Sequence, residues 1–160
     1  MCIRDSSGTS NTYGVGIRVI KDFFYSYVST NDLSRAGLLK AAKKAALAIK
    51  NKKKNIKINL VEERLNNIHP IAINPLDIPK MEKKEYLSEL SKAAYSASNK
   101  VKRIDTSIAD KIQNVMIANS LGLWVEDVRT YTSVSVSAVV DNGKEQFEDF
   151  NRKAGMRGFE

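Results

Sequence analysis

The residue types that most often carry out chemistry are scarce in this sequence. Its 160 residues include one histidine, His69, and one cysteine, Cys2. A catalytic metal site of the two-histidine or three-histidine kind cannot be completed from one histidine, and one cysteine forms neither an internal disulfide nor a cysteine-based zinc cluster. Pro70 disfavours helix at His69, so we expect this side chain to lie in an exposed loop.

Carboxylates and serines show no catalytic pattern either. Acidic pairs occur at Glu62-Glu63 and Glu126-Asp127, but sequence neighbours on a strand point to opposite faces and do not form an acid–base dyad. The serines within residues 132–140 have no base assigned to them, so nucleophilic catalysis has no support. Gly14-Val15-Gly16 lacks the third glycine and the following helix of a dinucleotide-binding fingerprint.

The positive charge lies in the first part of the chain. The formal net charge is +8, and residues 1–60 contain 12 Lys and Arg against 3 Asp and Glu. A basic segment of this kind suits nucleic acid or an anionic surface, and it equally suits a solvated, lysine-rich helix face. The sequence has no run of about 18 apolar residues and no secretory signal pattern, so we expect a cytoplasmic protein without a membrane span.

Apolar periodicity predicts the elements that must position these residues. Residues 14–28 indicate a β-hairpin, and the cap-forming residues 29–32 precede a helix that runs to about residue 51. One face of that helix is apolar from Leu38 and Leu39 onward, and the opposite face carries Lys40, Lys43 and Lys44. The remaining expected elements are a strand at 56–61, an extended loop at 62–81, a helix at 82–102, strands at 104–109, 113–118, 123–128 and 132–140, and a charged, aperiodic tail at 144–160.

The order β-β-α-β-α-β-β-β predicts an α/β fold of the α+β type. We expect a two-layer domain with two helices packed on a mixed, mainly antiparallel β-sheet. In the strand at 132–140, one face carries Val134, Val136, Ala138 and Val140, and the other carries Ser133, Ser135, Ser137 and Val139. A polar sheet face is either solvated or the lining of a cavity, and the sequence leaves both interpretations open.

Three stretches, read in order, resemble a single family. They are Tyr13–Ile20 followed by Val28–Ser34, then Ala118–Thr130, and finally Gly155–Glu160. With the helix–strand–helix between them and the proline-containing linker Asn74–Pro79, they resemble the N-terminal domain of the TldD/PmbA metalloprotease family. The Val-Arg-Thr strand and the Arg-Gly-Phe-Glu ending look more like the TldD side than the PmbA side.

The resemblance implies a subunit of a cytoplasmic, zinc-dependent peptidase that acts on unfolded or modified peptides. Such subunits pair into homodimers or heterodimers with a TldD/PmbA-type partner and enclose the active site in a chamber; neither a membrane nor a nucleic-acid partner is implied. The family's motif, His-Glu-x-x-x-His with a further cysteine ligand, is absent from this sequence. No catalytic residue and no metal ligand can therefore be assigned here, and zinc is expected only in the full-length protein.

The ends of the chain give expected boundaries. Met1–Ser6 resembles a translated sequencing-adaptor remnant, so residues 1–10 are expected to be a non-native leader. Residues 11–142 are expected to form the α/β domain. Residues 143–160 are expected to begin a linker to a C-terminal catalytic domain that lies beyond Glu160.

Four residues are candidates for a substrate channel: Arg129, Ser133, Ser135 and Ser137. We expect their polar sheet face to look into the chamber, and a peptide could lie along a sheet edge through main-chain hydrogen bonds. The alternative function is a small basic nucleic-acid-binding module, in which the tyrosines of the first hairpin stack on bases beside the basic helix. A metal-binding helix after Glu160 would favour the peptidase.

Overall fold

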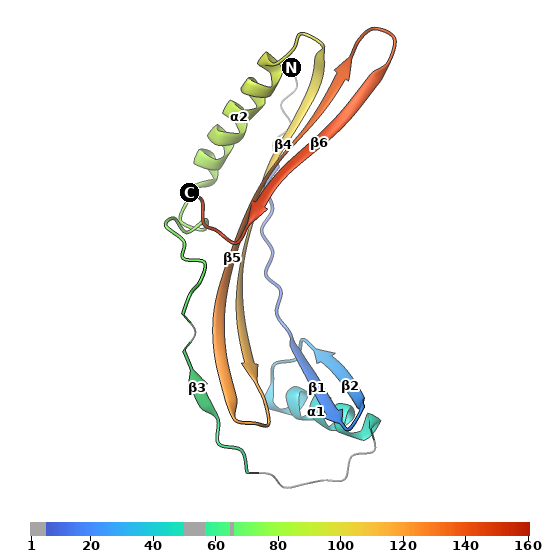
Figure 1. Cartoon of the computed structure of the whole chain (residues 1–160), viewed down its shortest axis with the longest axis vertical. Coiled ribbons are helices and arrows are strands. Elements are labelled where there is room, and N and C mark those ends of the chain that lie inside the picture. Colours follow the sequence, from blue (N-terminus) through green and yellow to red (C-terminus); the bar gives the residue numbers. More distant parts are fainter. Residues whose placement is uncertain (1–5, 50–56, 65) are drawn as a thin grey trace. The chain divides into compact units, whose positions relative to one another are not determined.

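The computed structural model describes residues 6–49, 57–64 and 66–160. The chain forms two compact units that divide after residue 56, and each unit is described by itself. The described residues contain two helices and six strands in the order β-β-α-β-α-β-β-β (Figure 1). The expected α+β class, with two helices and mainly antiparallel sheets, is confirmed.

The first unit is a short hairpin with a helix on one face. Strand β1 (Val15–Lys21) pairs antiparallel with β2 (Phe24–Thr30), as the sequence predicts. Alternate β1 side chains are half-buried, which gives the hairpin one inner face. Helix α1 (Arg35–Ala48) packs its buried Ala41 and Ala45 against this hairpin, and Ser26 Oγ donates a hydrogen bond to the carbonyl of Ala45.

Helix α1 begins at a well-formed N-cap. Ser34 Oγ accepts a hydrogen bond from the Gly37 amide at 3.0 Å, which satisfies one of the free amides of the first turn. The Asp32 carboxylate in turn accepts the Ser34 amide at 3.0 Å, and hydrogen bonding from Ser34 lowers the pKa of Asp32 below its usual value. The helix was expected to run to about residue 51, but it ends at Ala48, and the basic turn at 51–55 lies outside the described residues.

The second unit is built around one long strand. Strand β5 (Leu123–Asp141) pairs antiparallel with β4 (Val101–Ala118) along almost its whole length. On its other side β5 pairs in parallel with β3 (Val61–Glu63) near one end and antiparallel with β6 (Gln146–Gly155) near the other. The hairpin turns use glycines in the left-handed region, Gly122 at φ 100° and Gly143 at φ 86°.

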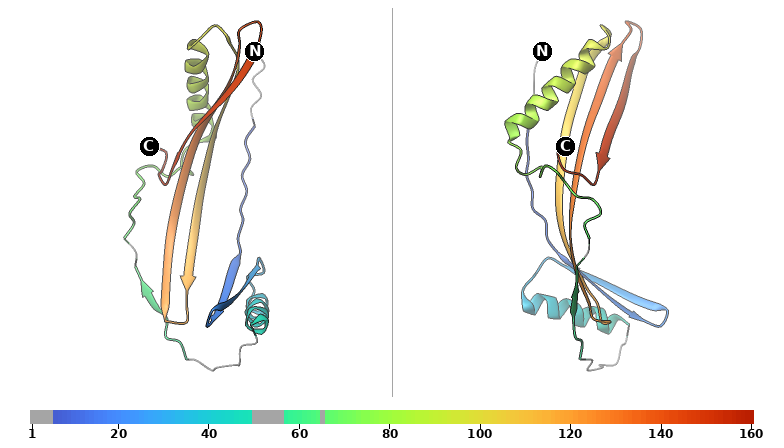
Figure 2. Two further views of the ribbon diagram at one scale, coloured as in Figure 1. Left: turned by 45° about the vertical axis from the view of Figure 1, so that its right-hand side comes forward. Right: turned by 60° about the vertical axis from the view of Figure 1, so that its left-hand side comes forward.

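Helix α2 (Lys80–Ser96) covers one face of this sheet, alongside β4 (Figures 1 and 2). Thr106 Oγ1 donates to the carbonyl of Leu87 at 3.4 Å, and the Tyr95 hydroxyl accepts the amide of Ile104 at 3.2 Å. Lys83 Nζ forms an ion pair with Asp110 Oδ2 at 2.6 Å, with only 19% and 12% of these side chains exposed. No helix in the described part of the chain is long and apolar enough to cross a membrane.

The strands differ from the expected ones in length. Residues 104–118 form one strand, because Asp110, which interrupts the apolar pattern, is paired with Lys83 and stays within β4. The segments expected at 123–128 and 132–140 are likewise joined in β5. Of the strand expected at 56–61, only the last residue lies in β3, and residue 56 lies outside the described residues.

The organisation of the chain also differs from the expected one. Each helix packs on its own sheet, α1 on β1–β2 and α2 on the sheet of the second unit, instead of both packing on one sheet. Residues 146–155, expected to fall in a linker from residue 143, form β6. This strand is exposed on both faces except at Gly155, so its sequence carries no alternation. The leader expected at residues 1–10 stays a prediction.

The N-cap predicts a measurable contribution to stability. Replacing Ser34 with Ala should lower the free energy of unfolding of the first unit by about 1 kcal/mol, because the Gly37 amide loses its acceptor. Urea unfolding of the full-length protein, followed by a signal from the first unit, measures this change. Ser29→Ala, at an exposed position on β2, is the matched control, and an equal loss in both variants would contradict the prediction.

Candidate functional site

The candidate channel residues share one face of β5. Side chains along a strand alternate, and β5 has no irregularity in its pairing with β4 between residues 124 and 139. Arg129, Ser133, Ser135 and Ser137 therefore point to the same side. Helix α2 contacts Ile104, Thr106 and Asp110 of β4. These residues pair with even-numbered residues of β5, whereas the candidate channel residues are odd-numbered. The sequence-predicted residues thus line the sheet face that α2 leaves uncovered.

The serines of this face are held in a polar network across the three strands. Ser135 Oγ lies 2.7 Å from Ser107 Oγ of β4. Ser137 Oγ donates to Glu148 Oε1 of β6 at 3.0 Å, and Arg152 Nη2 of β6 donates to Ser133 Oγ at 3.0 Å. Among the hydrogen bonds of the described residues, the one carboxylate on these hydroxyls is Glu148, which is 62% exposed and also lies 3.8 Å from Arg103. No histidine contacts a serine of this face in the described structure, so we regard these serines as a polar wall.

Arg129 is fixed in place by its neighbours on the same face. Its Nε donates to Asp127 Oδ2 at 2.6 Å, and about a third of each side chain is exposed, 37% for Arg129 and 33% for Asp127. This hydrogen bond, followed by the charge of Asp127, raises the pKa of Arg129 above its usual value. A short ion pair orients the guanidinium, and a side-chain hydrogen bond with Tyr131 raises the pKa of Arg129 further.

Glu126 and Asp127 act separately, as the sequence predicts for neighbours on a strand. Glu126 Oε1 accepts a hydrogen bond from Trp124 Nε1 at 3.1 Å, while Asp127 pairs with Arg129. The two carboxylates lie on opposite faces of β5. This arrangement provides no acid–base dyad.

The described residues do not fit the metal that the resemblance implies. His69 is exposed in a loop, as expected, and its backbone amide donates to Asn67 Oδ1 at 2.9 Å. Within residues 6–49, 57–64 and 66–160, no group of three or more His, Cys, Asp or Glu side chains lies close enough to hold a metal ion. We therefore assign no metal-dependent step to this chain.

One edge of β5 carries backbone groups without a strand partner. β3 pairs with β5 as far as Val125, where the parallel register bonds the Glu126 amide to the Glu63 carbonyl, and the pairing with β6 begins at Thr132. The backbone from the Glu126 carbonyl to residue 131 therefore faces no strand on that side. Among the described residues, no backbone hydrogen bond from that side reaches the stretch beyond the Glu126 amide. An interrupted sheet edge of this kind is a template for an added strand.

The parity of β5 shows which residues face this open edge. The Leu123 carbonyl accepts the Asn119 amide and the Asp141 amide donates to Lys100, so odd-numbered residues direct their backbone groups toward β4. The Gly122 carbonyl accepts the Val61 amide of β3, which places even-numbered residues on the other side. Backbone groups alternate along a strand. The open edge, defined here as the side of residues 126–131 away from β4, thus presents the carbonyl of Glu126 and the backbone groups of Val128 and Thr130; Val128 is exposed and Thr130 is buried.

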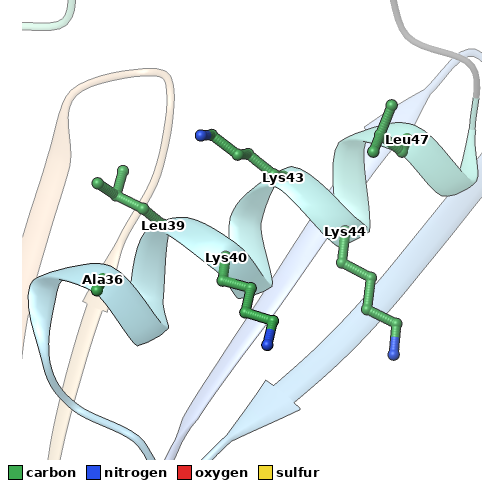
Figure 3. Close-up of a pocket in the computed structure, with 6 residues that line it drawn as sticks. All are labelled: Ala36, Leu39, Lys40, Lys43, Lys44 and Leu47. Atoms are coloured by element: carbon green, nitrogen blue, oxygen red, sulfur yellow. The ribbon is translucent and has the colours of Figure 1, made fainter.

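A hollow of about 610 Å³ lies on the outer face of α1 in the first unit (Figure 3). Leu39 and Lys43 point to one side of the helix in this view, and Lys40 and Lys44 point to the other. Leu39, expected on the apolar inner face, is 51% exposed. The hollow is lined by Ala36, Leu39, Lys40, Lys43, Lys44 and Leu47. Its lining contains no acid, histidine, serine or cysteine, so we regard it as the solvated basic face of α1.

Comparison with known protein families gives two matches. Residues 73–160, more than half of the chain, match the PmbA/TldA metallopeptidase central domain. Residues 4–49 match PmbA/TldA metallopeptidase domain 1. The two matched segments fall in the two compact units, one in each.

Curated relatives agree with these matches. A protein named Metalloprotease TldD homolog from Buchnera aphidicola is 25% identical over 135 residues, and one of the same name from Haemophilus influenzae is 26% identical over 139 residues. Each alignment covers 83% of this chain and 28% of the relative, so the chain spans little more than a quarter of their length. The chain therefore belongs to the TldD/PmbA family of metallopeptidases.

Proposed function

We propose that this chain is the non-catalytic scaffold and substrate-chamber part of a zinc-dependent, TldD-like peptidase that acts on unfolded or modified peptides. Family membership and the names of the curated relatives support the peptidase activity of the full-length protein. Zinc and its ligands would be supplied by a part of the protein outside this sequence. The family match favours this function over a nucleic-acid-binding module.

The open edge of β5 is the observation that carries the proposal. It presents the carbonyl of Glu126 and the amides and carbonyls of Val128 and Thr130 in the pattern to which an extended chain can add as a further strand. Main-chain hydrogen bonds are independent of side-chain identity. A peptidase with many unfolded substrates needs recognition of this kind, because folded proteins have already paired their backbone groups.

The polar face beside the open edge supports a role as a chamber wall. Hydroxyl groups and paired charges give it hydrogen-bonding capacity without a continuous apolar surface on which a peptide would adhere. Arg129 and Asp127 lie on the stretch of β5 that borders the edge, where the guanidinium can reach a carbonyl or carboxylate of a bound peptide. The wall would orient a peptide, and the chemistry would occur elsewhere in the chamber.

We further propose that the full-length protein works as a homodimer or as a heterodimer with another TldD/PmbA-type subunit. The first unit exposes a cluster of aromatic side chains at the end of its hairpin: Phe23 is 101% exposed, Phe24 73% and Tyr25 70%. Contiguous exposed apolar surface of this kind marks interaction sites. Burial of these aromatic side chains against a second subunit in the assembled protein would support the proposed dimer.

Removing the Arg129 guanidinium should weaken peptide binding without affecting the metal. In the full-length protein, Arg129→Ala should raise KM for an unstructured peptide about fivefold, the size of one lost charge-assisted hydrogen bond of ~1 kcal/mol, and leave zinc content and kcat unchanged. Steady-state kinetics and metal analysis measure these quantities. Arg103→Ala, on the same face of β4 but away from the open edge, is the matched control; equal effects of the two variants would remove Arg129 from the site.

Blocking the open edge should impair cleavage more strongly. Val128→Pro removes an amide that faces the edge and leaves the bonds between β5 and β4 in place, so kcat/KM for unstructured peptides should fall about tenfold or more. Val128→Ala, which shortens the same side chain and keeps the amide, should retain nearly normal cleavage. If the alanine and proline variants cleave peptide equally well, the edge does not bind substrate.

A further inference from the structure

Strand β6 stops at a point where its pairing with β5 could continue. The last pair joins Gly155 to Thr132, and the antiparallel register would next place Arg157 opposite Thr130 and Phe159 opposite Val128. These β5 residues present their backbone groups at the open edge. Residues 156–160 instead leave the sheet, and the edge stays open for that reason.

The backbone groups that would extend β6 are bonded elsewhere. The Arg157 carbonyl accepts a hydrogen bond from Thr132 Oγ1 at 3.3 Å, and the Phe159 amide donates to the Ile73 carbonyl at 2.9 Å. In an extended β6 the same carbonyl and amide would bond to Thr130 and Val128. The two arrangements of residues 156–160 therefore exclude each other.

The side chain of Phe159 anchors this departure to α2. Its ring packs edge-on against Tyr86, with centroids 5.3 Å apart, and Lys83 Nζ lies 5.5 Å from its centre. Lys83 Nζ also donates to the Pro75 carbonyl at 2.6 Å and pairs with Asp110 at 2.6 Å. One lysine thus joins the loop at 73–79, strand β4 and the Phe159 ring.

Gly158 makes the close approach possible. It is buried, and a Cβ at this position would overlap the carbonyl oxygen of Ile73. The Glu160 carboxylate accepts the amide of Gly158 at 3.0 Å and that of Ile73 at 3.2 Å, which holds the same loop from the other side. A side chain at residue 158 is incompatible with this set of contacts.

We infer that residues 156–160 are a latch with two states. While the segment is bound to Ile73 and α2, the open edge of β5 is free; when the segment is released, it covers that edge. Released, the segment would continue β6 by pairing Arg157 with Thr130 and Phe159 with Val128. Use of the latch to control peptide access rests on the proposed function. A peptide that occupies the edge binds only the latched state, so it stabilises that state in proportion to its affinity.

Gly158→Ala tests the latch in the full-length protein without any peptide. In the unaltered protein, amide-resolved hydrogen exchange should show slow exchange at Arg129, whose amide faces β4, and fast exchange at Val128. In the variant the Phe159 amide should lose its Ile73 acceptor, and exchange at Val128 should slow at least tenfold as β6 extends. Exchange at Asp127, whose amide faces β4, should be unchanged.

A second variant separates release of the latch from misfolding. Phe159→Ala removes the ring anchor without adding bulk and should slow exchange at Val128 in the same direction, whereas Phe147→Ala, an exposed β6 residue without a ring contact in the described structure, should not. Release of residues 156–160 frees the Ile73 amide from Glu160, so exchange at Ile73 reports it. Faster exchange at Ile73 with Val128 still in fast exchange would overturn the latch, and so would an Ile73 amide that stays protected in both variants. Because no peptide is present, these outcomes are independent of whether the edge binds substrate.

Discussion

The backbone pairing of strand β5 is the constraint on which the second unit depends. One strand of this length serves three partners: β4 occupies one side throughout, and β3 and β6 divide the other side between them. Sheet hydrogen bonds are satisfied or left open strictly by parity, so the gap between β3 and β6 exposes a defined set of amides and carbonyls. The ends of β3 and β6 define this gap, and the polar face borders it. Residues 156–160 leave it open because they turn away from the sheet.

The buried pair Lys83–Asp110 holds the elements around that strand together. Asp110 would be costly to bury in the middle of β4 without a counter-charge, and Lys83 supplies one from the first turn of α2. Asp110 Oδ1 has no hydrogen-bond partner among the described residues, so the ion pair is the single compensation for this carboxylate. Because the same ammonium contacts the loop at 73–79 and the Phe159 ring, removal of either charge would disturb the latch as well as the packing of α2.

Sequence patterns predicted the parts of the fold in which one face is buried and the other is not. The hairpin β1–β2, helix α1 and the alternation that places Ser133, Ser135 and Ser137 on one face follow from periods of two and 3.6 residues. Strand β6 was not foreseen, because an edge strand exposed on both faces leaves no period in its sequence. The unbroken length of β4 was missed for a different reason, since the partner of Asp110 lies 27 residues away.

The candidate site was predictable in part. Period-two alternation was enough to group Arg129 with the serines, but the open edge depends on where β3 and β6 stop pairing, and no local pattern encodes those two ends. The diversion of residues 156–160 depends on a hydrogen bond between Phe159 and Ile73, which are 86 positions apart in the sequence. Gly158 is the one local signal, because a glycine in a buried position often marks a close approach of two backbones.

The central claim is that the exposed backbone of β5 receives an extended peptide. Amide-resolved hydrogen exchange of the full-length protein with a saturating, uncleavable, unstructured peptide tests it most directly. The account predicts slower exchange at Val128 and Thr130, with no change at Asp127 and Arg129, whose amides already bond to β4. Saturation by peptide without slower exchange at either edge residue would contradict it.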